Sequence, residues 1–336
     1  MNPRLFFTFA GFGLLVLIGG ASPLHADITV RLSVKFILNT NGAYPVISSA
    51  NTGIGTNAGF QIEVDRGNGV LAATGRGYKL QVVEYLPIQP PPPAGQPANF
   101  WFTNAARGNR QAVEDASSAD PVSWRRNVAG AINIYVNNSS SGQCAFLANG
   151  DSMTLGTSIS AGTVLHELGH FFNLSHTHDG DLNCTNPPPY AVADGDGLSE
   201  TVPDHNCYAS RAALMAALPP ELQPFVDTSW LNVMSYHQED QLLDIQMDYW
   251  TWAANHDRLT VCSGRTWFVA TDGSDNILIN DGLSSEQAFQ TLDWTLLHPT
   301  SPDDILLLRA GEYPSPASIT TPCTLRATGG SVTLFR

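Results

Sequence analysis

The chain has little basic charge, few cysteines and, beyond its first residues, no long apolar run. Lys and Arg number 16 against 30 Asp and Glu, which gives a formal net charge of −14. Nucleic acids and anionic membranes are poor partners for such a protein, because both are negatively charged. The 336 residues, 43% hydrophobic and 14% charged, are enough for one large or two ordinary domains. This composition is typical of a globular secreted protein.

Five cysteines are present, and none lies in a C-x-x-C pattern of the kind that binds zinc or transfers electrons. An odd number leaves at least one thiol unpaired within the chain. Cys184 and Cys207 bracket an acidic segment, and we expect a disulfide between them that would pin this segment. A bridge between Cys144 and Cys262 stays open, because disulfide connectivity does not follow from sequence.

The N-terminus has the pattern of a secretory signal peptide, expected at residues 1–26. Arg4 provides the positive charge, and a nearly unbroken apolar run extends from Leu5 to Ile18. Cleavage could follow Ala21 or Ala26, and the small flanking residues fit Ala21 better. The run is shorter than the roughly 20 residues that a membrane anchor needs. We therefore expect a secreted or extracytoplasmic protein, in the periplasm or at the cell surface, without stable membrane insertion.

One stretch, from Gly162 to His176, carries a metal-binding pattern. On a helix, His166 and His170 lie one turn apart on the same face. Two imidazoles placed in this way can both reach one Zn²⁺ at about 2.0–2.1 Å. Glu167 lies roughly 100° around the helix from His166. Its carboxylate can therefore take a proton from a zinc-bound water, which makes it the candidate general base.

His176 follows His170 too closely for both to be ligands on one straight helix. A continued helix would carry His176 about 9 Å further along the axis and onto another face. We predict this helix over Ser160–Leu174, with Ser160 as its N-cap. The helix must therefore end between His170 and His176, and the chain must turn back there. Asn173 lies midway between the two histidines and is suited to the left-handed conformation that such a turn needs.

These residues resemble the metzincin zinc peptidases, whose motif is H-E-x-x-H-x-x-G/N-x-x-H. Downstream, Asn232–Tyr236 (N-V-M-S-Y) resembles the Met-containing turn of the pappalysin-like branch. The resemblance implies that Met234 forms an apolar floor below the histidines and that Tyr236 approaches the metal or the substrate oxyanion. It also implies an α+β fold, a zincin domain with a mixed twisted sheet and a zinc helix, which we place at residues 27–264.

Between the two motifs, residues 194–204 resemble the acidic D-G-x-x-D-T-P segment of pappalysins. The chain departs from that pattern at 200–202, where Glu-Thr-Val replaces Asp-Thr-Pro. An oxygen-rich loop that contains glycine suits Ca²⁺. Bound Ca²⁺ is therefore a second expectation, with the candidate ligands Asp194, Asp196, Glu200 and Thr201.

Further polar residues near the motifs are candidates by type only. His178, Asp179 and Asp181 could orient a ligand imidazole from behind, although a solvated turn is the favoured explanation for each. A fourth protein ligand would close the metal position that water needs. We therefore expect His205 and His237 not to be ligands.

Hydrophobic periodicity predicts the remaining elements. Strands are predicted at 28–38 (half-buried), 60–64, 78–86 and 131–136, and helices at 103–118, 210–218 and 241–259. Residues 87–97, which include four consecutive prolines, are expected to form a stiff connector. Residues 137–158 are expected to form a polar loop or an edge hairpin. The aromatic residues of the last helix, Tyr249 and Trp252, are expected in the core.

Beyond Gly264 the chain resembles the start of a right-handed parallel β-helix of the pectate-lyase type. The segment D-D-I-L-L-L-R-A-G-E-Y, from Asp303 to Tyr313, carries this resemblance best. We place the module at residues 265–336 and expect a helix near 286–297, within the module, to cap its open end. About 70 residues allow two or three coils, so we expect the stack to be incomplete or covered by a partner at its end. Such a module implies contact with a polysaccharide or a cell surface.

Three functions are compatible with these patterns. The first is a secreted zinc endopeptidase that acts on a peptide or protein, with His166, His170 and His176 as zinc ligands, Glu167 as general base and acid, and Tyr236 at the oxyanion. The second is a carbohydrate-binding or surface-adhesion protein with a structural or inactive zinc site. Structural zinc sites usually have four protein ligands, and three with an intact Glu167 favour catalysis. The third, a polysaccharide lyase, needs a catalytic groove on a long β-helix, which this chain lacks.

Overall fold

A computed structural model describes most of the chain from Ile28 to Phe335. The described residues are 28–45, 54–104, 106–127, 130–139, 144–146, 150, 152–156, 162–178, 196–202, 204, 208–237, 240–258, 261–276, 280, 282–297, 303–314, 319 and 323–335. The expected signal peptide at 1–26 lies outside them. Among the helices of the described part, none is long and apolar enough to cross a membrane.

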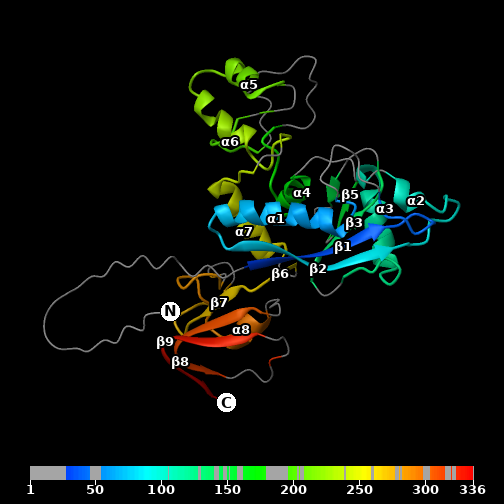
Figure 1. Cartoon of the computed structure of the whole chain (residues 1–336). Coiled ribbons are helices and arrows are strands. Elements are labelled where there is room, and N and C mark those ends of the chain that lie inside the picture. Colours follow the sequence, from blue (N-terminus) through cyan, green and yellow to red (C-terminus); the bar gives the residue numbers. More distant parts are fainter. Residues whose placement is uncertain are drawn as a thin grey trace, which may run out of the picture.

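A six-stranded mixed sheet forms the centre of the larger part of the molecule (Figure 1). Its strands are β1 (Ile28–Ile37), β2 (Tyr78–Ile88), β3 (Ile132–Val136), β4 (Cys144–Phe146), β5 (Ser152–Leu155) and β6 (Cys262–Ser263). They lie in the order β2-β1-β3-β5-β4, with β6 on β1. Strands β2, β1, β3 and β5 run parallel, whereas β4 and β6 are antiparallel to their neighbours. The edge hairpin allowed for 137–158 is thus present as β4 and β5.

Strand β1 lies in the middle of the sheet and is buried on both faces. The half-buried strand predicted at 28–38 is therefore wrong in its exposure, although its bounds are nearly right. Val34 and Phe36 face one core, while Ser33 and Lys35 on the opposite face are also fully buried. Lys35 Nζ donates to the Asn133 side chain on β3, which satisfies a charge that burial would otherwise penalise. On this face of β1, polar groups of β3 therefore take the place of the solvent that the alternating pattern predicted.

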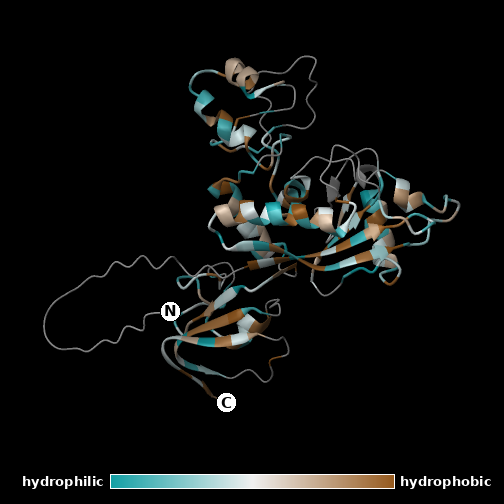
Figure 2. Cartoon of the chain, viewed as in Figure 1, coloured by the Kyte–Doolittle hydropathy of each residue, from teal (hydrophilic) through white to brown (hydrophobic). Residues whose placement is uncertain are grey.

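Three helices share one hydrophobic core with the first face of the sheet: α1 (Asn57–Ala73), α4 (Thr163–Phe171) and α7 (Asp244–His256). The strand predicted at 60–64 is wrong, because these residues lie in α1. Phe60 and Val64 are one helical turn apart and both are buried, while the Thr56 hydroxyl caps the N-terminus. Within only five residues, this spacing of apolar side chains is compatible with a strand as well as with a helix. The brown colour along the sheet in Figure 2 marks this hydrophobic layer.

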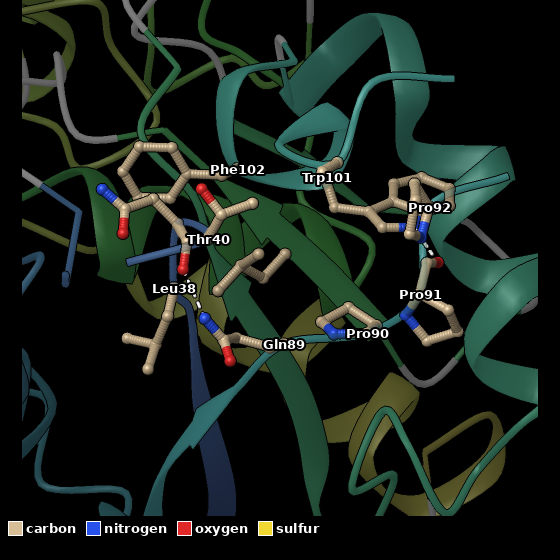
Figure 3. Close-up of a pocket in the computed structure, with 11 residues that line it drawn as sticks. Leu38, Thr40, Gln89, Pro90, Pro91, Pro92, Trp101 and Phe102 are labelled. Carbon is tan, nitrogen blue, oxygen red and sulfur yellow. Dashed lines mark hydrogen bonds between the residues drawn. The ribbon is translucent and has the colours of Figure 1, made fainter. Parts of the chain in front are cut away.

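The other face of the sheet is covered by α2 (Phe100–Thr103) and α3 (Ala106–Ala119), which together replace the single helix predicted at 103–118. Trp101 donates its indole N–H to the Pro91 carbonyl oxygen at 2.9 Å. The proline-rich connector is thus fixed along α2, beside a cavity of about 230 Å³ (Figure 3). In that cavity the Gln89 side-chain amide also donates to the Asn39 carbonyl, which ties the connector to the turn after β1.

A smaller lobe follows the candidate metal-binding stretch and contains α5 (Arg211–Ala217), η2 (Gln223–Phe225) and α6 (Val226–Trp230). These elements have their own small apolar cluster. Helix α7 then returns to the main core through Met247 and Trp250, which are fully buried. Tyr249 and Trp252 are each 52% exposed, so their predicted core position is wrong. The helical face that packs inward is shifted by one residue from the face that the apolar spacing suggested.

The C-terminal part is a separate, fully parallel sheet in the order β7-β8-β9. Its strands are β7 (Thr266–Val269), β8 (Ile305–Pro314) and β9 (Thr324–Phe335), with the short helix α8 (Leu292–Leu297) against them. Parallel strands with one pass per turn are what the predicted coils require. With three strands described, the β-helix stays a prediction.

Asp304, fully buried, holds the start of the C-terminal part in place beside the junction. Its carboxylate accepts hydrogen bonds from the Arg265 backbone N–H at 2.9 Å and from the Trp267 indole N–H at 3.0 Å. The Arg265 guanidinium in turn donates to the Ala254 carbonyl on α7. Arg265 therefore contacts the main core directly, and Asp304 acts on this junction by fixing the backbone of Arg265.

We expect Asp304→Ala to lower the free energy of unfolding of the C-terminal part by about 1–3 kcal/mol, because buried donors lose their acceptor. Urea unfolding followed by tryptophan fluorescence measures this, since Trp267 is 2% exposed. Asp303→Asn is the matched control, because Asp303 is exposed and asparagine tolerates its left-handed backbone. Equal unfolding midpoints for the two variants would show that Asp304 does not hold the junction.

Candidate metal centre

Helix α4 carries the first two candidate ligands and begins later than predicted. It starts at Thr163, after Gly162 in the left-handed conformation (φ +82°), and the proposed cap Ser160 lies outside the described residues. The Gly162 N–H donates to Glu63 Oε2, at 2.6 Å, from α1. Glu63 is 2% exposed, so a buried carboxylate from another helix satisfies the N-terminus of α4. No local sequence pattern marks this contact.

The C-terminus of α4 turns back as predicted, one turn earlier than position 174. Asn173 has φ +66°, and the Leu174 N–H donates to the Gly169 carbonyl at 2.9 Å. This is the Schellman arrangement, in which a left-handed residue ends the helix. Arg258 donates to the Phe171 carbonyl at 3.0 Å and lies 4.1 Å over its ring. A cation at this end suits the helix dipole.

The bend brings the three predicted histidines together. His166 Nε2 lies 3.1 Å from His176 Nε2, and His170 Nε2 lies 2.9 Å from the same atom. The three candidate donor atoms all lie within 4.8 Å of one another, and His166 is buried while the other two are half-buried. Within the described ranges, these residues form the sole group of three or more His, Cys, Asp or Glu side chains suitably placed for a metal.

Backbone carbonyls set the tautomers of two of these rings. His166 Nδ1 lies 2.7 Å from the Val233 carbonyl, and His170 Nδ1 lies 2.7 Å from the Leu174 carbonyl. A carbonyl only accepts, so each Nδ1 carries the hydrogen and each Nε2 of a neutral ring presents a lone pair. Both lone pairs point at His176 Nε2, which can donate to one of them at most. A cation that accepts nitrogen ligands fits this set of donors, and Zn²⁺ prefers imidazole nitrogen.

Burial keeps these rings neutral at physiological pH. It lowers the pKa of His166 to about 3, with the neighbouring His170 acting in the same direction. Burial likewise lowers the pKa of His170 to about 4, against the effect of the Leu174 carbonyl. Neutral imidazole is the form that binds a metal, so no proton needs to leave either ring at pH 7.

The Met-containing turn lies directly below α4. Met234 is fully buried, and a Cβ added to Gly169 would lie 2.4 Å from its sulfur. The Asn232 side chain accepts from the Met234 N–H at 2.8 Å, which shapes the turn. The apolar contact between Met234 and the helix therefore requires glycine between the two ligand histidines.

Tyr236 and Glu167 border the three histidines. The Tyr236 ring centroid lies 4.8 Å from that of His176 and 6.4 Å from that of His166, and the residue is 39% exposed. Glu167 follows His166 on α4 and is half-buried. The Tyr236 ring is therefore close to the histidine rings and accessible to solvent, and Glu167, the neighbour of His166 in the chain, is also partly accessible.

The acidic segment is described in part. Asp196 accepts from the Leu198 N–H and from the Thr201 hydroxyl at 2.8 Å, whereas Glu200 is exposed. The structure thus brings together Asp196 and Thr201 of the four Ca²⁺ candidates, and Asp194 lies outside the described residues.

The two disulfides considered from the sequence have different outcomes. The expected pair Cys184 and Cys207 lies outside the described residues. The alternative bridge from Cys144 to Cys262 is wrong, because Cys262 is a free, buried thiol.

Four other residues lie around the site, and of these the sequence suggested a role only for His178, as a residue that orients a ligand imidazole. Glu63 and Arg258 hold the two ends of α4. His178 stacks on His176 with an 8° angle between the ring planes, and Asp204, fully buried, accepts from Thr177. His237 Nε2 lies 3.2 Å from the Asp204 carbonyl, and His237 is not part of the group of three histidines. His205, Asp179 and Asp181 lie outside the described residues.

Comparison with known proteins adds no family to this description. No family model matches the chain, and no curated protein matches it. The functional argument therefore depends on the residues and their geometry.

We expect Gly169→Ala to destabilise the protein by about 1–3 kcal/mol, because the added methyl group overpacks the site against Met234. Gly69→Ala in α1 is the control, since a Cβ there meets no atom within 4 Å. That change should stabilise the helix by up to about 1 kcal/mol. Urea unfolding of both variants is the measurement, and a Gly169→Ala protein as stable as the control would refute the contact.

The metal-free protein should lose stability as the pH falls from about 6.5 towards 4. The pKa of unfolded histidine is about 6.5, whereas His170 titrates near 4 when folded, so the unfolded state binds more protons in between. His170→Asn removes this group and should show a shallower decline in melting temperature over the same range. Identical slopes for the two proteins, measured by calorimetry with a chelator present, would contradict the buried neutral ring.

Proposed function

We propose that the protein is a secreted zinc-dependent endopeptidase of the pappalysin-like metzincin type. The observation that carries the proposal is the convergence of three imidazole Nε2 atoms from one bent segment, two of them with lone pairs set by backbone carbonyls. The H-E-x-x-H spacing, the turn at Asn173 and the methionine below the helix support it together. A peptide or protein is the proposed substrate, and a nucleic acid is not, given the net charge of −14.

The residues around the rings have the chemistry that peptide hydrolysis needs. Zn²⁺, when bound by the three imidazoles, supplies a water of lowered pKa and polarises a carbonyl. The Glu167 carboxylate accepts the proton of the attacking water and later delivers it to the leaving amine nitrogen. The hydroxyl of Tyr236, whose ring lies 4.8 Å from that of His176 and is partly exposed, donates a hydrogen bond to the developing oxyanion.

The number of protein ligands favours catalysis over a purely structural role. Structural zinc sites are closed by four protein side chains, whereas hydrolytic sites keep one position for water. The part of the chain that the structure describes offers three. The competing function is a carbohydrate-binding or adhesion protein with a structural or inactive zinc site. A structural site would need a fourth protein ligand, and an inactive site would lack the general base, whereas Glu167 is present.

The other parts of the chain have accessory roles in this proposal. Residues 1–26 direct export and are removed, which places the enzyme outside the cytoplasm. Ca²⁺ at Asp196 and Thr201, with Asp194 and Glu200, would stabilise the segment beside the site. The parallel C-terminal sheet, as the start of a β-helix, provides contact with a polysaccharide or a cell surface.

The replacement Glu167→Gln tests the mechanism. The variant should bind one zinc ion per chain like the wild type, because the imidazoles are untouched, and should lose proteolysis by about 10²–10⁴-fold. Zinc content by mass spectrometry and digestion of casein, with and without a chelator, are the measurements. Asp227→Asn, an exposed change in the small lobe, is the control and should keep both properties. Casein digestion by Glu167→Gln at the wild-type rate, or digestion that the chelator leaves unchanged, would refute the proposal.

A further inference from the structure

Asp204 lies at the centre of the contacts behind the histidines. It is fully buried, and both of its carboxylate oxygens accept hydrogen bonds from hydroxyl groups. Thr177 Oγ1 donates to Oδ1 at 2.5 Å, and Ser235 Oγ donates to Oδ2 at 2.5 Å. Thr177 directly follows the third histidine of the motif, and Ser235 lies between Met234 and Tyr236. One carboxylate therefore joins the segment of the third ligand to the Met-containing turn.

His178 extends this connection to the rings themselves. Its Nδ1 lies 3.5 Å from Asp204 Oδ1, and both side chains are completely buried. The His178 ring is parallel to that of His176, with centroids 5.0 Å apart, and meets the Tyr236 ring at 4.2 Å and 67°. The His178 ring therefore contacts the rings of both His176 and Tyr236, and the same side chain lies beside Asp204.

Backbone contacts in the same place bring the two segments together. The Thr177 N–H donates to the Met234 carbonyl at 3.4 Å, which is a long hydrogen bond. The His237 N–H donates to Ser235 Oγ at 3.0 Å, so the hydroxyl that reaches Asp204 is itself oriented. The two charge-assisted hydrogen bonds of Asp204 are shorter than this backbone contact and are the stronger link.

We infer that Asp204 is the positioning residue of the site, which holds His176 for the metal and Tyr236 for the substrate at the same time. The inference rests on the proposed zinc peptidase function and adds to it a residue outside both sequence motifs. A buried carboxylate with both oxygens bonded has one stable orientation, and it transmits that orientation to the neighbours of Thr177 and Ser235. Groups that orient metal ligands from behind commonly change metal affinity or activity 10–100-fold when removed.

Asp204→Asn is the direct test in the full-length protein. Asparagine keeps the size of the side chain, but its amide nitrogen cannot accept a hydroxyl hydrogen, so one of the two links is lost. We expect zinc affinity to fall by about 10–100-fold, measured by competition with a chromophoric chelator. With zinc saturating, kcat should fall while KM stays within about twofold, because a displaced Tyr236 loses contact mainly with the oxyanion. Asp227→Asn is the matched control.

A spectroscopic measurement separates ligand geometry from general stability. Co²⁺ bound at the three histidines has visible absorption bands that depend on coordination geometry. We expect these bands to shift in Asp204→Asn and to remain unchanged in Asp227→Asn. Urea unfolding of the metal-free proteins reports stability independently.

Two further variants show which link matters. Thr177→Val removes the bond on the side of His176 and should weaken metal affinity. Ser235→Ala removes the bond on the side of Tyr236 and should lower kcat with metal affinity less affected. In the double variant Asp204→Asn with Ser235→Ala, the losses should be smaller than the sum of the single losses, because both changes break one link.

The outcomes distinguish this inference from the proposed function. A wild-type chain that binds neither Zn²⁺ nor Co²⁺ overturns both. A wild-type chain that binds metal and digests casein, beside an Asp204→Asn protein with the same affinity, spectrum and kcat, overturns only the role of Asp204. If Asp204→Asn does not fold, the variants of Thr177 and Ser235 decide: unchanged affinity in the first and unchanged kcat in the second overturn the inference.

Discussion

The hydrogen bonds from His166 and His170 to backbone carbonyls determine what this site can bind. They fix which nitrogen of each ring carries the hydrogen and so which one offers a lone pair. The two acceptors come from different places, Val233 in the Met-containing turn and Leu174 in the turn after α4. Since both carbonyls belong to backbone that other contacts hold in place, ring orientation is a property of the fold. The direction of each Nε2 lone pair is therefore set by the fold itself.

Much of the site follows from local spacing in the sequence. The ligands on α4, the left-handed Asn173 and the position of Met234 all depend on residues a few places apart, where helix and turn geometry set the distances. The contacts of Glu63, Arg258 and Asp204 join segments far apart in the chain. Each of these residues satisfies a polar group whose partner has no fixed sequence distance, so no periodicity indicates it. The convergence of the three histidines was thus predictable, and the residues that hold them in place were not.

The errors in the fold have the same cause. The five residues 60–64 do not reveal a helical period, so their pattern predicts a strand where the structure has a helix. Alternation along 28–38 predicts one solvent-exposed face, whereas Lys35 on that face is buried and Asn133 on the next strand provides its acceptor. Apolar spacing in the last helix marks a face without showing which edge of it is buried, so it predicts Tyr249 and Trp252 in the core although both are exposed. In each case tertiary packing, not local preference, decided the outcome.

The charges at the two ends of α4 show why this helix is so well placed. Glu63 lies at the N-terminus and Arg258 at the C-terminus, which is the arrangement that the helix dipole favours. Burying a carboxylate and a guanidinium costs free energy that these bonds offset only in part, so their main effect is to fix position. The hydrophobic cluster that α4 shares with the sheet is large, unlike the core of a small zinc-dependent domain. The position of α4 therefore depends on this core, and the short segment from Asn173 to His176 brings the third imidazole to the two on the helix.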